Sequence, residues 1–106
     1  MRKEVKWFAE QMEKILKEND GKDHWSSYSL GHLFGLLNEE VGELESSIPS
    51  NDGLLTPRAL DEIIKECGDV SNFSMMIADN AKRLKAKRLI EKENQRETKT
   101  KLTHKR

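Results

Sequence analysis

The feature that most constrains the fold is a stretch from residue 58 to about 90 that is apolar on most sides of a predicted helix. Thr56 and Pro57 precede it, a pair favoured at a helix N-cap and first turn. The apolar residues that cover its circumference are Leu60, Ile63, Ile64, Cys67, Val70, Phe73, Met75, Met76, Ile77 and Ala78. Such a helix must be covered on several sides. We therefore expect an all-α domain whose core is completed by dimerisation or tetramerisation.

Two shorter amphipathic helices are predicted before this stretch. Apolar residues recur every three or four positions in residues 2–18, and the Asn-Asp-Gly at 19–21 would end that helix. The second helix is predicted over 29–48, with Ser29 or a serine before it as the N-cap. Three glycines lie on one side of this second helix: Gly31, Gly35 and Gly42. Their alignment predicts that another helix or a ligand approaches the backbone there.

Charge is divided unevenly along a chain whose formal net charge is zero. Residues 1–81 hold 8 Lys/Arg and 16 Asp/Glu, a net charge of −8, whereas residues 82–106 hold 11 Lys/Arg and 3 Glu, a net charge of +8. The acidic part fits a cation-binding core. Because apolar residues become sparse beyond Lys82, we expect a helical domain over 1–90 and a basic, disordered tail over 91–106.

Length and cysteine content exclude several classes of protein. A chain of 106 residues with 35% apolar residues is one domain at most, with a small core. Cys67 is the sole cysteine, so no internal disulfide can form, and no Cys/His spacing suits zinc. No apolar run reaches 18 residues and no signal-peptide core is present. We therefore expect a cytoplasmic protein with no membrane partner.

Five acidic residues form two short blocks, Glu39-Glu40-x-x-Glu43 and Glu66-x-x-Asp69. Glu40 with Glu43, and Glu66 with Asp69, are i,i+3 pairs, so each pair projects from one side of its helix. Two such helices packed together would focus four or five carboxylates on one point. That much negative charge cannot be desolvated unless a cation lies among it. All-oxygen ligands select Mg²⁺ or Mn²⁺, and these ions usually act on phosphates.

The alternative interpretation of these acids is a solvated surface. In a chain with 36% charged residues, Glu-Glu-x-x-Glu on a helix is ordinary. Glu66 and Asp69 argue against that interpretation, because Lys65 is the only other charged residue between Ile63 and Ala78. Carboxylates in so apolar a helix need a partner. We therefore favour a metal site over surface acids.

The two-block spacing, with 22 residues between Glu43 and Glu66, resembles that of the all-α nucleoside triphosphate pyrophosphohydrolases, the MazG-like family. Its relatives include dimeric dUTPases, dCTP pyrophosphatases and phosphoribosyl-ATP pyrophosphohydrolases. Residues 63–80, and the tryptophan-bearing loop before Glu39, are also similar to small MazG-like proteins, and the resemblance covers about residues 22–82. It implies a MazG-like helical bundle of two or four subunits that hydrolyses a nucleoside triphosphate to a monophosphate and pyrophosphate.

The resemblance also implies roles for the acids. Glu40, Glu43, Glu66 and Asp69 correspond to the Mg²⁺ ligands. Glu39 is an additional ligand or orients the attacking water, and it is our candidate for water activation.

Phosphate charge requires cations beside the metal, and the base requires a surface on which to stack. Lys22, His24, Lys65 and either Lys82 or Arg83 are candidate cations. Trp25 would stack on a base or anchor its loop. Asn80 would bind sugar or base, or satisfy a neighbouring helix, the role that we favour for Asn72. The residues predicted to bind substrate are Lys22, His24, Trp25, Asn80 and Lys82.

Two other functions stay open on the sequence alone. A phosphoribosyl-ATP pyrophosphohydrolase-like enzyme would use the same metal site with a different base pocket. A helical interaction module would use the basic tail to bind nucleic acid or an acidic partner. The tail has no interleaved aromatic residues for stacking, which disfavours nucleic acid as a partner. Di-iron chemistry is disfavoured because no Glu-x-x-His is present.

Overall fold

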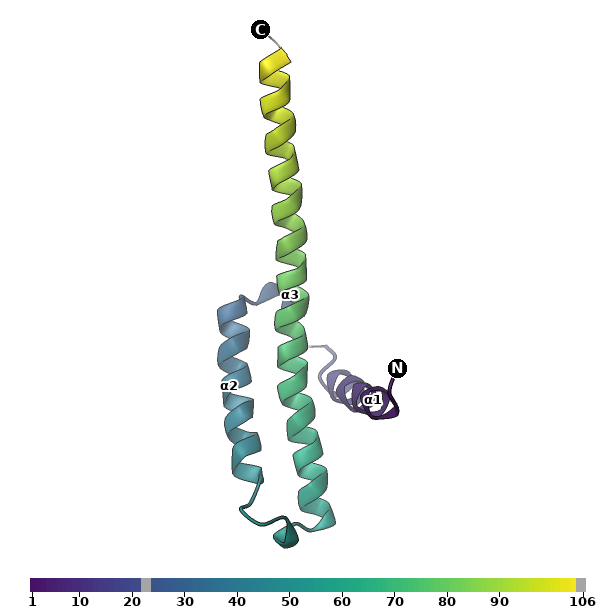
Figure 1. Ribbon diagram of the computed structural model, residues 1–106. Helices are drawn as coiled ribbons and strands as arrows, with labels where there is room; N and C mark the ends of the chain where they lie inside the picture. Colours follow the sequence, from purple (N-terminus) through teal and green to yellow (C-terminus); the bar gives the residue numbers. More distant parts are fainter. Residues whose placement is uncertain (22–23, 105–106) are drawn as a thin grey trace.

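A computed structural model describes residues 1–21 and 24–104 of the chain (Figure 1). Three α-helices follow one another: α1 (Lys3–Glu18), α2 (Leu30–Ser47) and α3 (Pro57–His104). Short 3₁₀ helices lie in the two connections: η1 (Trp25–Ser27) and η2 (Asp52–Leu54). No strand is present in the described ranges, which confirms the predicted all-α class.

The helices begin and end where local chemistry predicts. The Ser29 hydroxyl accepts a hydrogen bond from the backbone N–H of His32 (3.1 Å), and Thr56 does the same for Ala59 (3.2 Å). These bonds satisfy N–H groups that a first helical turn leaves without partners. After α1, Gly21 adopts a φ of +97°, a left-handed conformation that glycine allows without strain.

The first half of α3 is the central element. In Figure 1, α2 runs antiparallel beside it and α1 crosses it on another side. Among the described residues α1 contacts α3 but not α2. Leu33 of α2 is the one apolar side chain in this part of the chain that is fully buried. The core is therefore small. Large apolar side chains are exposed on all three helices, among them Trp7, Phe34 and Leu60.

The close approach predicted at the glycines of α2 is not found within the described chain. A Cβ added at Gly31, Gly35 or Gly42 would meet nothing within 4 Å. The close approach lies instead at Gly68 of α3, where an added Cβ would collide with Cδ1 of Ile15 in α1. The missing side chain at Gly68 therefore lets α1 pack on α3.

The third helix continues well past the boundary predicted near residue 90. Residues 91–104, for which the sequence predicts disorder, are helical, and residues 105–106 lie outside the described part. Glu, Lys, Gln and Arg dominate this segment and are good helix formers. An i,i+3 ion pair between Arg88 and Glu91 (3.3 Å) adds to their propensity. The extension makes the molecule elongated, 77 × 30 × 29 Å.

Within residues 1–21 and 24–104, no helix combines the length and the apolar content needed to cross a membrane.

Candidate metal centre and adjoining cavity

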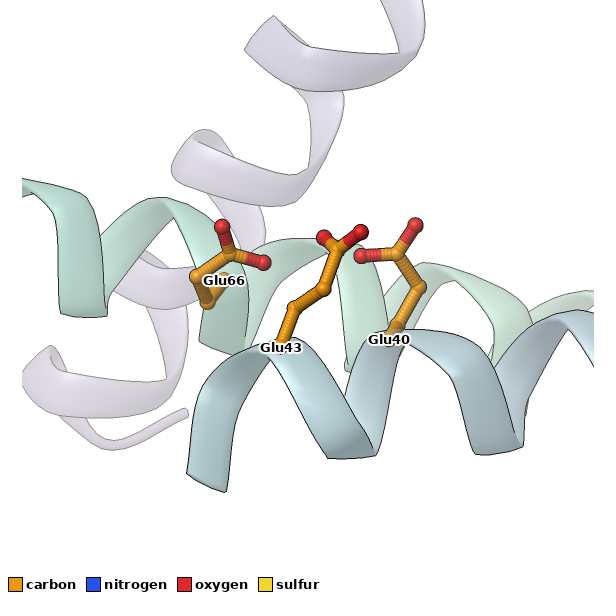
Figure 2. A group of neighbouring side chains, drawn as sticks. All are labelled: Glu40, Glu43 and Glu66. Atoms are coloured by element: carbon orange, nitrogen blue, oxygen red, sulfur yellow. The ribbon is translucent and has the colours of Figure 1, made fainter. Parts of the chain in front are cut away.

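Three of the predicted acidic ligands converge between α2 and α3. Figure 2 shows the carboxylates of Glu40 and Glu43, one turn apart on α2, beside that of Glu66 from α3. One carboxylate oxygen from each residue lies within 4.8 Å of the other two. The i,i+3 spacing on α2 and the antiparallel packing of the two helices together produce this convergence.

These carboxylates lack positive partners. Glu66 is only 8% exposed, and its Oε2 atom has no hydrogen-bond partner among the described residues. The Oε2 atom of Glu40, a half-buried residue, likewise has no hydrogen-bond partner among the described residues. None of the ion pairs in the described part of the chain involves Glu40, Glu43 or Glu66. Buried carboxylate oxygens without partners are costly, and these three residues could hold a cation.

The electrostatics of the cluster agree with this geometry. Burial raises the pKa of Glu40 to about 7, and the negative charges of Asp69 and Glu43 act in the same direction. Burial likewise raises the pKa of Glu66, with Glu43 as the next cause. Each acid is thus harder to ionise because its neighbours are negative and water is partly excluded.

Asp69, the fourth predicted ligand, lies beside the cluster but outside it. Its Oδ2 atom is 3.4 Å from Nζ of Lys65, one turn back on α3. The charge of Asp69 is also the main reason why the pKa of Lys65 is raised. Glu39, the predicted water-activating residue, is exposed on α2 and is not part of the three-carboxylate group.

A cavity of about 500 Å³ adjoins the cluster. Glu40, Lys65 and Asp69 line it, together with aromatic side chains of the first loop, His24, Trp25 and Tyr28. Apolar residues of all three helices form another part of its wall: Ile15, Leu16, Leu33, Leu36, Phe73 and Met76. The remaining lining residues in the described part of the chain are Asn19, Asp20, Gly21 and Asn72. Charged and aromatic groups therefore share one cavity, whose size is typical of a site for a small molecule.

The aromatic part of this wall is a short, ordered structure. His24 is the N-cap of η1 and accepts a hydrogen bond from the backbone N–H of Ser26 (3.1 Å). Its ring stacks on that of Trp25 with 4.1 Å between centroids. The indole Nε1 of Trp25 donates to Oδ2 of Asp79 on α3 (2.9 Å). Trp25 thus both lines the cavity and anchors its loop.

Asn80 of α3 forms hydrogen bonds with the backbone of the same loop. Its side-chain N–H groups donate to the backbone carbonyls of Trp25 (2.9 Å) and Tyr28 (3.1 Å), and Arg83 donates to its Oδ1. Asn80 is 6% exposed and is not among the residues that line the cavity; its amide bonds the first loop, whereas the sequence predicted a contact with substrate or with a neighbouring helix.

The sequence alone did not single out Asp79. Its carboxylate accepts from Trp25 and forms an ion pair with Arg83 (2.8 Å). The i,i+4 spacing of Asp79 and Arg83 was the available signal, but such pairs are also common on solvated helices.

Of the remaining predicted residues that the structure describes, Asn72 alone is among those that line the cavity. Lys82 is exposed on α3 and does not line the cavity, and Lys22 lies outside the described residues. Asn72 is 3% exposed and donates to the backbone carbonyl of Met12 in α1 (3.2 Å), which confirms that it satisfies a neighbouring helix.

Comparison with known proteins returned no match: no family model, no curated protein and no solved structure matches this chain. The similarity to the MazG-like family therefore stays a prediction from motif spacing, and a function must be argued from the site itself.

Proposed function

We propose that this protein is a Mg²⁺-dependent nucleoside triphosphate pyrophosphohydrolase, which converts a (d)NTP to a (d)NMP and pyrophosphate. The observation that carries the proposal is the convergence of Glu40, Glu43 and Glu66 beside the cavity, with two buried oxygens that have no partner. An all-carboxylate donor set suits Mg²⁺, with Mn²⁺ as a substitute. The motif spacing described above supports the same conclusion.

Each part of the site would have a distinct task. Glu40, Glu43 and Glu66 would hold the ion, and Asp69 would join them or keep Lys65 in place. Mg²⁺ supplies neutralisation of phosphate charge and greater acidity of a water molecule. Lys65, which lines the cavity, would face the phosphates, and Glu39 stays our candidate for accepting the proton of the attacking water. The stacked rings of His24 and Trp25 offer a flat surface for a base.

We also propose that the chain works as a homodimer or homotetramer in a MazG-like bundle. The support is the small core, with Leu33 alone fully buried in the described part, and the exposure of Phe34 and Val41 on α2 and of Ile48 directly after it. Burying such side chains against a second subunit would add stability at roughly 25 cal/mol per Å². Nucleoside triphosphates are cytoplasmic metabolites, so the proposal implies a cytoplasmic enzyme.

The test is pyrophosphate release from a panel of ribo- and deoxyribonucleoside triphosphates and phosphoribosyl-ATP, with Mg²⁺ and with EDTA. We expect Mg²⁺-dependent release from at least one nucleotide. Glu43→Gln should lower kcat/KM by about 100-fold or more, because a bound metal contributes several kcal/mol to such reactions. Glu45→Gln, which removes a charge from another exposed position two residues away on α2, is the matched control.

Two results would refute the enzyme. One is the absence of release from every substrate in the panel at any Mg²⁺ or Mn²⁺ concentration. The other is a Glu43→Gln variant as active as Glu45→Gln. Either result would favour the helical interaction module.

A further inference from the structure

The C-terminal part of α3, residues 81–98, is a helix exposed to solvent on all sides. Every residue from 81 to 98 is exposed, and in Figure 1 this segment extends beyond α1, α2 and both loops. No side chain between 84 and 98 is buried by another described element, so packing within the chain does not explain this part of the helix. Its charge is the other unexplained feature, because residues 82–106 carry a net +8.

Helical geometry sorts these charges into a row. Lys85, Arg88, Lys92 and Arg96 follow one another at spacings of three, four and four residues. At 100° per residue they fall within an arc of roughly 80°, and they extend over about 16 Å of helix. We call these four residues the basic row. The three glutamates of the segment, Glu91, Glu93 and Glu97, lie about 100° or more from the centre of this arc, although Glu91 is close enough to Arg88 to pair with it (3.3 Å).

We propose that the basic row binds the phosphate backbone of a nucleic acid duplex without reading its sequence. Its cations are spaced about 4.5–6 Å apart along the axis, which suits a regular polyanion. A helix about 10–12 Å across also fits a major groove about 12 Å wide. A disordered tail would hold the same cations in no fixed order. The helix is therefore the observation that changes the expectation from the sequence, which disfavoured nucleic acid.

The composition of the helix separates a duplex from other polyanions. No Phe, Tyr or Trp follows Phe73, so the segment lacks the large aromatic rings that bind the bases of a single strand. The side opposite the basic row is mixed, with Ala86, Ile90, Glu93 and Glu97. A membrane-surface helix needs a continuous apolar face there. Phosphate contacts from Lys and Arg require neither aromatics nor an apolar face.

The far end of the basic row lies well away from the acidic body, whereas its first member, Lys85, is about 6 Å along the helix from Ala81. Residues 1–81 carry a net −8 and would repel phosphates. Arg96 lies about 22 Å along the helix from Ala81. That separation is about twice the distance over which charges interact at 0.1 M salt.

The test measures binding of the full-length protein to a fluorescein-labelled 20-base-pair DNA by fluorescence anisotropy between 50 and 200 mM NaCl. Four phosphate contacts predict a slope of about −3.6 for log affinity against log salt, or about a 100-fold loss of affinity over this range. The variant Lys85→Gln/Arg88→Gln/Lys92→Gln/Arg96→Gln should lose binding at 50 mM. The matched control, Lys3→Gln/Lys6→Gln/Lys14→Gln/Lys17→Gln, removes the same charge from exposed positions of α1 and should bind like wild type.

The readout is independent of nucleotide hydrolysis, so the two proposals can fail separately. Absence of duplex binding by wild type at 50 mM, or a slope near zero, overturns the inference without any variant. Equal losses in the two variants, with helicity verified by circular dichroism, also overturn it, because net charge alone would then act. Binding to phosphatidylserine vesicles, or salt-sensitive self-association, in place of duplex binding overturns it in favour of a membrane or a second acidic body.

Discussion

Replacing Glu66 by glutamine should make the metal-free protein more stable while abolishing its response to Mg²⁺. Glu66 is the most buried acid of the cluster, and its Oε2 atom has no hydrogen-bond partner among the described residues. Glutamine has nearly the same shape and no charge. The substitution therefore removes the repulsion and leaves the packing between α2 and α3 in place.

The magnitude follows from the distance between the carboxylates. Two unit charges 4.8 Å apart, the separation within which the three oxygens lie, repel by about 3.5 kcal/mol at an effective dielectric constant of 20 and by about 0.9 kcal/mol in bulk water. Glu66 is buried whereas its neighbour Glu43 is exposed, so the pair lies between these limits. We expect Glu66→Gln to raise the free energy of unfolding by about 1–3 kcal/mol at pH 8 in EDTA and low salt.

Thermal unfolding followed by circular dichroism measures both parts of this prediction. For a domain of this size the gain corresponds to at least about 4 °C in Tm. Mg²⁺ at about 100 times its Kd should stabilise wild type by about 2.7 kcal/mol and should leave Glu66→Gln almost unchanged. Glu45→Gln, an exposed acid of α2 outside the cluster, is the control and should behave as wild type in both conditions. A destabilised Glu66→Gln variant that still gains wild-type stability from Mg²⁺ would refute the reasoning.

Two other predictions concern the cluster and the loop. Because the folded state raises the pKa of Glu40 from 4.5 to about 7, it holds that proton more tightly than the unfolded chain does. The stability from this group is thus complete below about pH 4.5 and is lost as pH rises through about 7. The Tm of metal-free protein should fall over this window in wild type and less in Glu40→Gln, and an equal fall in both would contradict the assignment. In a Trp7→Phe background, Asp79→Ala should increase acrylamide quenching of Trp25 fluorescence and raise KM more than it lowers kcat. Asp79→Asn, which keeps an acceptor for the indole N–H, should restore most of both properties, and quenching unchanged by Asp79→Ala would exclude the proposed contact.

The parts of the fold that local chemistry determines were predictable. Ser29 and Thr56 cap their helices as the sequence predicts, and the helices predicted at 2–18 and 29–48 are found within a residue of these bounds. The meeting of Glu40, Glu43 and Glu66 was also predictable, because the i,i+3 pattern fixes direction on a helix and carboxylates in an apolar helix need a common partner.

What the sequence did not show depends on contacts between distant segments. The glycines of α2 form an obvious pattern, yet the close approach is at Gly68, where the register of α1 on α3 decides which side chain arrives. Asp79 serves Trp25, a residue 54 positions away, and no local pattern reveals such a bond. The helical extension was missed because its apolar residues are sparse, whereas its charged residues favour a helix without packing.

The packing of α1 against α3 alone, within the described residues, has a consequence for the entry of a ligand into the cavity. Ile15 and Leu16 of α1 form part of the cavity wall, yet in the described chain α1 touches α3 and not α2. Movement of α1 away from the bundle would break only its contacts with α3. The packing of α2 on α3, which positions the carboxylates, would stay intact. Amide hydrogens of α1 should accordingly exchange with solvent sooner than those of the α2–α3 pair, and a bound ligand touching Ile15 should slow them. We therefore expect any ligand of this cavity to enter and leave by movement of the first helix.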